Sequence, residues 1–410
     1  MSKTFWRFSA FWIFMVLFKF GGGLHFSMLS ALGEQVLPLW IVGIIISIGT
    51  IFQLILDVPA GYLGDKIGYL RTLKITSLIF ILGALCLTFG LNQLSFILTV
   101  LIGNFGWLFF GPGVSAYILS HAEKKTSGQF ISTKEIFGSI GVVLSTGILG
   151  FAVGLAPATI GLIITISMGL AFISLFFAPK DTHKAVVNDT PHHQNNLRRN
   201  ALRKTLSTLK SLSPASIMLV LVGFAACTFY AVIWFIIPLV IAHQSNGDFL
   251  SASLSVFDLS VVILGYFIGK IADHNDKRQV VFIGLLIFAV SGMLLSFNFN
   301  WLFLIFGFLA TTGDELASIS LWSWLHNLDE NHQHDGLISG TITFFEDLGW
   351  AIGPLIAGAL YDPIGPTLTI ALSSGLLIVV WLIYRIFFYH QHPAKLALHR
   401  IKPARKLHRG

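Results

Sequence analysis

Ionisable residues interrupt several long apolar runs of this chain. Lys19 stands within FKFGGGLHF, residues 18–26, and two acidic pairs, Asp314–Glu315 and Glu346–Asp347, stand in similar surroundings. A charge in apolar surroundings is costly, so such residues usually face a partner, a water-filled space or a functional site. Two adjacent carboxylates in a low-dielectric site cannot easily both ionise, so we expect one of each pair to hold a proton. These residue types therefore suggest anion binding by the lysine and proton binding by the carboxylates.

The sequence offers little for catalysis or metal binding. It contains no His-Glu-x-x-His motif and no other dense catalytic cluster, so we expect no catalytic residue and no cofactor. Three histidines in HNLDENHQHD, residues 326–335, could suggest a metal site, but a solvated loop explains them better. Cys86 and Cys227 both fall in apolar runs, where cysteine packs as a small hydrophobe.

The elements that must position these residues are membrane-spanning helices. The chain has 410 residues, of which 55% are hydrophobic and 11% charged, whereas soluble proteins are nearer a quarter charged. Its apolar runs have the ~20 residues that cross a bilayer core, and they lack the alternation of barrel strands. We predict an all-α membrane protein with twelve transmembrane helices. They lie at about 6–32, 39–62, 73–91, 95–119, 130–153, 157–178, 215–242, 250–271, 279–297, 300–324, 338–360 and 366–388.

Lysine and arginine predict the orientation of these helices. Alternate connections, near 33–38, 92–93, 154–156, 243–248, 298–300 and 362–366, contain neither residue type. The remaining connections carry a clear excess of both, which places them and both termini in the cytoplasm. We therefore expect a multi-pass protein of the cell membrane. Its net charge of +7 indicates contact with the anionic inner leaflet rather than with nucleic acid.

The two sets of six helices resemble each other at an offset of 208 residues. The matches are Gly61 with Gly269, Asp65 with Asp273, Asn92 with Asn300, Gly128 with Gly336, Gly141 with Gly349 and Gly150 with Gly358. Six matches at one offset indicate duplication, which is how many secondary transporters are built, with the substrate between the repeats. We predict six-helix bundles over residues 1–178 and 215–389.

A basic linker, residues 179–214, separates the bundles, and a basic cytoplasmic tail covers residues 390–410. The linker stretch NLRRNALRKTLSTLKSL places its leucines towards one side. An amphipathic helix on the inner leaflet and a disordered basic linker are both consistent with it. We expect the tail to be a disordered surface anchor.

Two related segments carry a family resemblance. They read GYLGDKIGYLR, residues 61–71, and GKIADHNDKR, residues 269–278. The first is similar to the signature loop of the major facilitator superfamily, and the similar topology covers nearly all of residues 1–390. The resemblance implies two pseudo-symmetric bundles and a loop that ties them together on the cytoplasmic side when the transporter faces outward. The gate residues that this implies are Asp57, Gly61, Asp65, Lys66, Gly68, Arg71, Gly269 and Asp273.

The sequence also departs from the family pattern. Tyr69 and Leu70 stand where a basic pair is expected, and helix 4 lacks the arginine or lysine usual in drug-proton antiporters of this superfamily. Helix 5 reads GVVLSTGILG, residues 141–150, without the Gly-Pro of the antiporter signature. These departures weaken an inference of proton-driven drug export, but not of the fold.

In this superfamily helices 1, 4, 7 and 10 line a central cavity, so the resemblance implies that Lys19 faces Asp314 or Glu315 across it. Gly22 and Gly23 share the helix face of Lys19. They either clear space for a bound group or let another helix come close. A permanent structural ion pair of Lys19 is the simpler alternative, and Glu135 reads as a structural residue near the interface. The substrate and coupling residues we predict are Lys19, Trp107, Tyr230, Trp234, Asp258, Asp314, Glu315, Glu346 and Asp347.

These features predict a secondary active transporter that moves a small molecule by alternating access, with proton coupling as an open option. A membrane-embedded lipid-modifying enzyme and a non-transporting membrane sensor are the alternatives. The partners we expect are a small-molecule substrate, protons and the lipid bilayer, and we expect a monomer.

Overall fold

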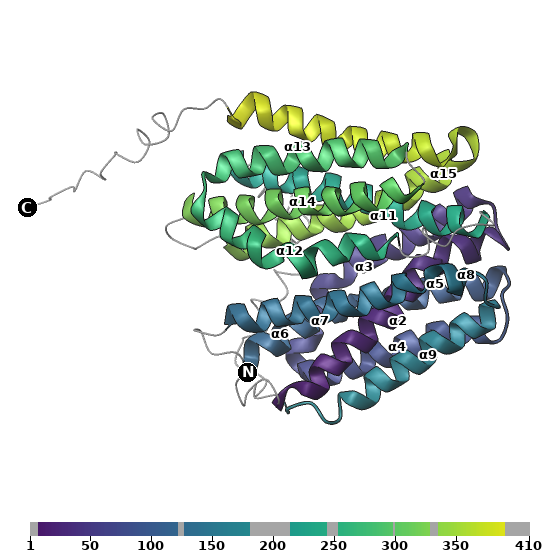
Figure 1. Cartoon of the computed structure of the whole chain (residues 1–410). Coiled ribbons are helices and arrows are strands. Elements are labelled where there is room, and N and C mark those ends of the chain that lie inside the picture. The colour runs from purple at the N-terminus through teal and green to yellow at the C-terminus, as the bar shows by residue number, and fades with distance from the viewer. Residues whose placement is uncertain are drawn as a thin grey trace, which may run out of the picture.

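The computed structural model describes residues 7–121, 127–180, 214–243, 253–297, 300–328 and 335–389. Within these ranges every regular element is a helix, and the helices form two bundles side by side (Figure 1). The first bundle contains α2 (Ser9–Glu34), α3 (Leu39–Ile67), α4 (Tyr69–Thr88), α5 (Gln93–Leu108), α6 (Phe110–His121), α7 (Ser127–Gly147), α8 (Leu149–Val153) and α9 (Pro157–Ser174). The second contains α11 (Pro214–His243), α12 (Ser255–His274), α13 (Lys277–Ser296), α14 (Trp301–Leu328), α15 (Asp335–Tyr384) and the π-helix η2 (Arg385–Tyr389).

Each predicted membrane segment coincides with helical residues, which confirms the all-α membrane fold. Nine helices of the described ranges are long and apolar enough to cross a membrane. The fourth predicted segment is split into α5 and α6, and the fifth into α7 and α8. The last two segments appear as the single element α15, whose 50 residues would measure ~75 Å if straight. Gly365 divides it, with φ 79° and ψ 171°, so α15 contains two helices that turn back on each other.

The sequence suggested that the family signature segment, residues 61–71, is a loop. In the structure this segment is helical except at one residue. Helix α3 continues through it to Ile67 and α4 begins at Tyr69, so Gly68 alone is non-helical. Gly68 has φ 94°, a conformation that favours glycine because a Cβ would be strained there. Its carbonyl accepts hydrogen bonds from the backbone N–H and the hydroxyl of Thr72, at 3.0 and 2.9 Å. One glycine with a capped carbonyl is therefore sufficient to reverse the chain.

The N-terminal end of α2 and the C-terminal end of the last described helix lie at the same end of the molecule (Figure 1). We call this the inner end and the opposite one the outer end, after the orientation that the charges predict. Helix α2 runs from the inner to the outer end and α3 returns. The central linker and the C-terminal tail, apart from their edges, lie outside the described residues.

The 208-residue offset reappears in helix packing. A Cβ on Gly141 would meet Val16, Lys19 and Phe20 of α2. A Cβ on Gly349 would meet Phe224, Cys227 and Thr228 of α11, which are the same positions plus 208. Both glycines therefore let two helices approach with their backbones nearly in contact. Helix caps repeat as well, since the side chains of Asn92 and Asn300 each accept a backbone N–H at the start of their helix.

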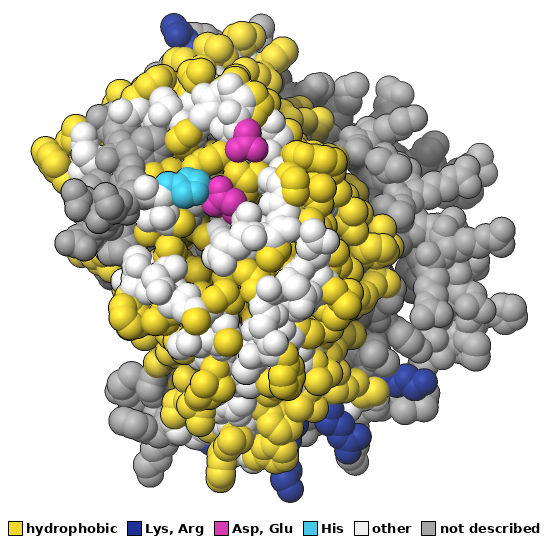
Figure 2. Space-filling model, turned by 90° about the vertical axis from the view of Figure 1, so that its right-hand side faces the viewer, with side chains coloured by type: hydrophobic (Ala, Val, Ile, Leu, Met, Phe, Trp, Pro, Cys, Tyr) yellow, Lys and Arg dark blue, Asp and Glu magenta, His cyan; other side chains and the backbone are white. Residues whose placement is uncertain are grey.

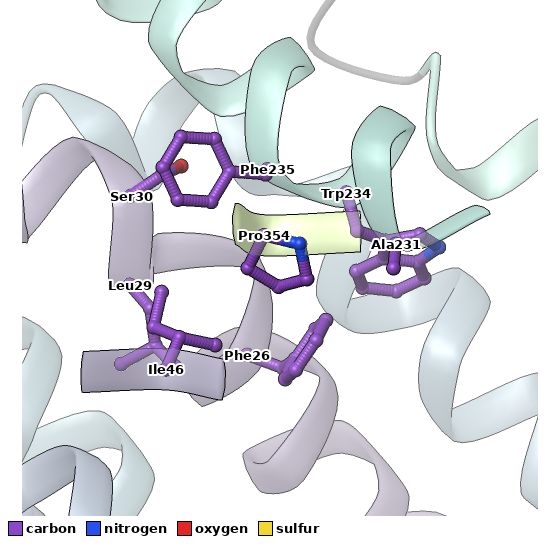
Figure 3. A pocket seen from close by; sticks show the side chains of 8 residues that line it. All are labelled: Phe26, Leu29, Ser30, Ile46, Ala231, Trp234, Phe235 and Pro354. Carbon is purple, nitrogen blue, oxygen red and sulfur yellow. The ribbon is translucent and has the colours of Figure 1, made fainter. Parts of the chain in front are cut away.

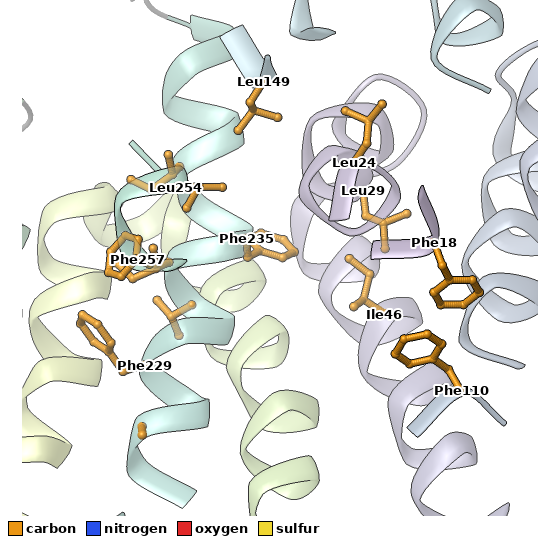
Figure 4. Packing of buried hydrophobic residues seen from close by; sticks show 14 of the residues in the cluster. Phe18, Leu24, Leu29, Ile46, Phe110, Leu149, Phe229, Phe235, Leu254 and Phe257 are labelled. Atoms are coloured by element: carbon orange, nitrogen blue, oxygen red, sulfur yellow. The ribbon is translucent and has the colours of Figure 1, made fainter. Parts of the chain in front are cut away.

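Large apolar side chains fill the interior of both bundles (Figure 4). In the first, Phe18 and Phe110 stack with ring centroids 4.2 Å apart. In the second, Phe229 packs edge-on against Phe288 at 5.6 Å. Many other large apolar residues are exposed, and Phe151 for example is 71% exposed. Such an apolar outer surface is what a lipid-facing protein requires.

Candidate functional site

Lys19 lies in an aromatic cage inside the first bundle. Its Nζ is 5.0 Å from the ring centroid of Trp107 and 5.3 Å from that of Phe110. Within the described part of the chain, no carboxylate oxygen lies within 4 Å of this nitrogen. An ammonium over an aromatic face is stabilised by the ring quadrupole, by ~0.5–2 kcal/mol. The rings therefore orient the lysine without neutralising its charge.

The glycines beside Lys19 allow helices to pack closely. A Cβ on Gly22 would lie 2.6 Å from Cζ2 of Trp107, and a Cβ on Gly23 would collide with the hydroxyl of Ser145. Gly22 thus makes room for the Trp107 indole, which contacts the Lys19 ammonium. Gly23 lets α7 approach α2. At Gly23 the structure therefore shows a close approach of two helices, while Gly22 faces a tryptophan side chain.

Four charged residues form what we call the charged cluster: Lys19, Glu135, Asp258 and Glu315. The acidic side chains that interact electrostatically with the Lys19 ammonium are Glu135 of α7 and Asp258 of α12. The same two residues interact with Glu315 of α14. Lys19 and Glu135 belong to the first bundle, and Asp258 and Glu315 belong to the second. The cluster therefore spans the two halves of the molecule.

The sequence predicts a structural role for Glu135, and in the structure this residue also interacts electrostatically with Lys19. It lies one helical turn from Gly138, whose missing Cβ would be 3.8 Å from Cε and Cγ of Lys19. Its carboxylate also pairs with Lys134 at 2.7 Å, and its side chain is 59% exposed. The sequence placed Glu135 near a helix start, and only the close approach of α2 and α7 at Gly141 brings it beside Lys19.

Asp314 occupies a separate polar network within the second bundle. The Tyr230 hydroxyl donates to Asp314 Oδ2 at 3.1 Å, and the Ser318 hydroxyl donates to Oδ1 at 3.3 Å. The resemblance implied that Lys19 faces Asp314 or Glu315, and the partners of Asp314 in the structure are these two hydroxyl donors. Tyr230, which lies on α11, is one of the predicted substrate and coupling residues. In the structure its hydroxyl makes a hydrogen bond. Its ring also stacks on Phe288, with centroids 5.7 Å apart.

The second acidic pair lies on α15 against α11. A Cβ on Gly223 would come within 2.9 Å of Glu346 Cγ, so this glycine makes room for the carboxylate side chain. Glu346 and Asp347 are both partly exposed, and both act electrostatically on Cys227. They lie with Asp314 on the side of the second bundle, not in the charged cluster. Among the described residues, no group of three or more His, Cys, Asp or Glu could hold a metal ion.

Towards the outer end, apolar side chains close the space between the bundles. Phe26 of α2 packs against Trp234 of α11 and Trp350 of α15, with centroid distances of 5.8 and 5.4 Å. A cavity of about 10 Å³ remains beside them, which is roughly the space for one water molecule. Figure 3 shows its lining residues, which come from both bundles. Trp234, which the sequence analysis includes among the substrate and coupling residues, thus contributes to an apolar seal.

Polar contacts join the bundles at the same level. The hydroxyls of Thr146 and Ser255 are 2.9 Å apart, and Ser255 also donates to the carbonyl of Val143 at 3.1 Å. At the inner end of α12, by contrast, a Cβ on Gly265 or Gly269 would meet nothing within 4 Å. The inter-bundle contacts described here therefore lie towards the outer end.

The gate residues implied by the signature segments stay predictions. The side chains of Asp57, Asp65 and Asp273, and the surroundings of Gly61, lie outside the described part of the structure. Lys66 and Arg71 are described and exposed. Residues that the sequence did not single out are Phe110 in the cage and Trp350 in the seal. Periodicity could not have found them, because each is one aromatic residue among many on an apolar helix.

Comparisons with known proteins agree with this architecture. The family model described as the Major Facilitator Superfamily matches residues 8–331 and 219–407. The quinolone resistance protein NorA of Staphylococcus aureus is 25% identical over 381 residues, which cover 86% of this chain and 88% of NorA. The low affinity inorganic phosphate transporter 4 of Medicago truncatula is 35% identical over 92 residues, covering 21% of this chain and 17% of that protein.

A similar solved structure is that of the peptide transporter POT in complex with sulfate, with a TM-score of 0.69 at 13% identity. The match covers 92% of this chain and 93% of that one. At this identity the likeness shows the fold alone. The family model, in contrast, matches nearly the whole chain, and the two helical bundles have the arrangement that it implies. The chain belongs to the Major Facilitator Superfamily.

Proposed function

We propose that this protein is a secondary active transporter that moves a small molecule across the cell membrane by alternating access. The observation that carries the proposal is the charged cluster, because each bundle contributes part of it. If the bundles rock against each other, the distances between Lys19 and the acidic residues of the second bundle change. A bound substrate or proton that alters these charges then alters the relative stability of the two arrangements.

The balance of charge supports proton coupling. Lys134 pairs with Glu135 and so adds a second ammonium group to that of Lys19. The cluster contains three carboxylates, those of Glu135, Asp258 and Glu315. Excess negative charge in a partly desolvated site is unfavourable, so the cluster is most stable when a bound proton balances it. The orientation with both termini in the cytoplasm belongs to the same proposal, since the lysine-rich and arginine-rich connections lie at the inner end.

The substrate-facing groups that we propose are Lys19 and Trp107 on the first bundle and Asp258 and Glu315 on the second. Lys19 has no close carboxylate among the described residues, so its ammonium is available to an anionic group of the substrate. Trp107 offers an apolar wall, as small-molecule sites usually do. The similar proteins include a quinolone resistance protein and an inorganic phosphate transporter, so quinolones and phosphate are the two compound classes to test first.

A reconstitution experiment tests this function. A thermal-shift screen of the purified protein against metabolites, lipids and drugs, including quinolones and phosphate, first identifies a ligand. Uptake of that ligand is then measured in proteoliposomes with and without an imposed pH gradient. We expect gradient-dependent transport, at least tenfold slower in Glu315→Gln and Asp258→Asn. Asp362→Asn, at the outer end, is the matched control and should transport normally.

Two results would contradict the proposal. Wild-type gradient dependence in both amide variants would show that the cluster does not couple protons. Turnover of a lipid by the purified protein in detergent, where no gradient exists, would instead indicate an enzyme.

A further inference from the structure

The outer ends of α2, α11 and α15 meet at three polar side chains. His243 Nε2 lies 3.1 Å from Glu34 Oε2, and His243 Nδ1 lies 3.4 Å from the Tyr361 hydroxyl. Glu34 is the last residue of α2, and His243 is the last residue of α11. The view onto the outer end shows a histidine beside an acidic side chain in the upper left part of the picture (Figure 2). This triad, Glu34–His243–Tyr361, therefore connects the first bundle to the second.

The hydrogen-bonding groups of the triad suit both charge states of the imidazole. In the neutral ring, Nε2–H donates to Glu34 and Nδ1 accepts from the tyrosine hydroxyl. In the protonated ring both nitrogens donate, and the hydroxyl oxygen accepts instead. The difference between the states is the ion pair with Glu34, which exists only when the imidazole is charged. Protonation thus strengthens one particular contact between the bundles.

Water and protons reach the triad from the outer side. The side chains of His243 and Glu34 are 53% and 30% exposed. The described titratable or charged groups on the elements packed here are Glu34 from α2, and Tyr361 and Asp362 from α15, while α8 (Leu149–Val153) offers none. Histidine is the side chain that ordinarily changes its charge between pH 5 and 8. A proton that reaches the imidazole from the outer side can therefore change the contact.

We propose that Glu34, His243 and Tyr361 form an external proton-binding site that holds the outer end closed when it is protonated. The inference rests on the proposed alternating access, because only separation of the bundles would part Glu34 from His243. A proton then binds more tightly to the closed arrangement than to the open one. By reciprocity, the proton favours the closed arrangement by the same factor. Exposed pairs of this kind shift such an equilibrium by roughly two- to fivefold.

Spin labels at symmetric positions measure this equilibrium. Phe89 and Phe297 are 87% and 58% exposed at the outer ends of α4 and α13, and they are related by the 208-residue offset. Labels at both positions, on a background with Cys86 and Cys227 replaced by alanine, report the outer distance by pulsed electron paramagnetic resonance. Labels at Ile75 and Ile283, which are 40% and 50% exposed near the inner ends of α4 and α13 and are related by the same offset, report the inner distance.

The probe is the proton alone, varied between pH 8.0 and 5.5 in proteoliposomes. We expect the ratio of the closed to the open outer population to rise on acidification. The rise should be roughly two- to fivefold smaller in His243→Gln and Glu34→Gln, one variant on each side of the contact. Asp362→Asn removes a neighbouring charge that does not contact the imidazole, so it should respond like the wild type.

The outcomes separate this proposal from the proposed function. If both labelled pairs show two populations, but His243→Gln and Glu34→Gln respond to pH like the wild type, the proton site is wrong and alternating access stands. A wild-type outer population that is insensitive to pH overturns the proton site as well. A single population at both pairs under every condition overturns alternating access, and the proton site with it.

Discussion

Substitution of Gly22 by alanine tests whether the glycines beside Lys19 exist for helix packing. The new Cβ would lie 2.6 Å from Cζ2 and 3.1 Å from Cη2 of Trp107, whereas carbon atoms prefer separations near ~3.5–4 Å. The indole would have to move by roughly 1 Å. It is held edge-on by Phe18, Phe80 and Phe110, at centroid distances of 5.5, 5.8 and 5.3 Å, so this movement also disturbs its neighbours.

The expected magnitude follows from two opposing effects. Overpacking of a filled core costs about 1–3 kcal/mol, while alanine in place of glycine stabilises a helix by up to ~1 kcal/mol. Gly21→Ala is the matched control, because its Cβ would come closest to the flexible end of Met168, at 2.9 Å, and would meet Ser167 at an ordinary contact distance of 3.4 Å. We expect Gly22→Ala to be less stable than Gly21→Ala by about 1–3 kcal/mol, which is the overpacking cost without the shared helix gain.

A double-mutant cycle measures this directly. Trp107→Leu removes the ring that Gly22→Ala would strike, so the two substitutions should be less destabilising together than their sum, by about 0.5–3 kcal/mol. Apparent melting temperatures of the purified variants in detergent report stability, and ligand uptake reports the position of Lys19. If Gly22→Ala were as stable as Gly21→Ala, or if the cycle showed no coupling, the packing argument would be refuted.

The remaining predictions concern the charge of Lys19, the helix contacts at Gly141 and Gly349, and the turn at Gly68. Lys19→Met should abolish ligand transport while Lys19→Arg keeps part of it, because the aromatic cage and the acidic neighbours require a cation. Equal transport by the two variants would show that transport does not depend on the charge of Lys19. Gly141→Ala and Gly349→Ala should each lower the free energy of unfolding by about 1–3 kcal/mol. Gly111→Ala is the control and should not lower it, because a Cβ there would meet open space. Thermal unfolding of the three purified variants measures the difference. Gly68→Ala should cost about 1–2 kcal/mol because φ is 94°, measured in the same way, and an unchanged melting temperature would argue against that turn.

The sequence by itself determined the class of fold. Hydrophobic runs of membrane length locate the helices, because backbone groups in lipid must be satisfied within each segment. The 208-residue offset also appeared in the sequence, since duplicated helices keep the glycines at which they touch. Gly141 and Gly349 show this most clearly, because both were matched before their contacts were known.

Only the tertiary structure decided which charges meet. The family resemblance placed Lys19, Asp314 and Glu315 on helices that line one cavity, but it could not fix the direction of each side chain around its helix axis. Rotation and helix approach direct Asp314 to Tyr230 and bring Glu135 towards Lys19. The triad of Glu34, His243 and Tyr361 was hidden for the same reason. Its members lie far apart in the chain, and three helices must end at the same level before they can touch.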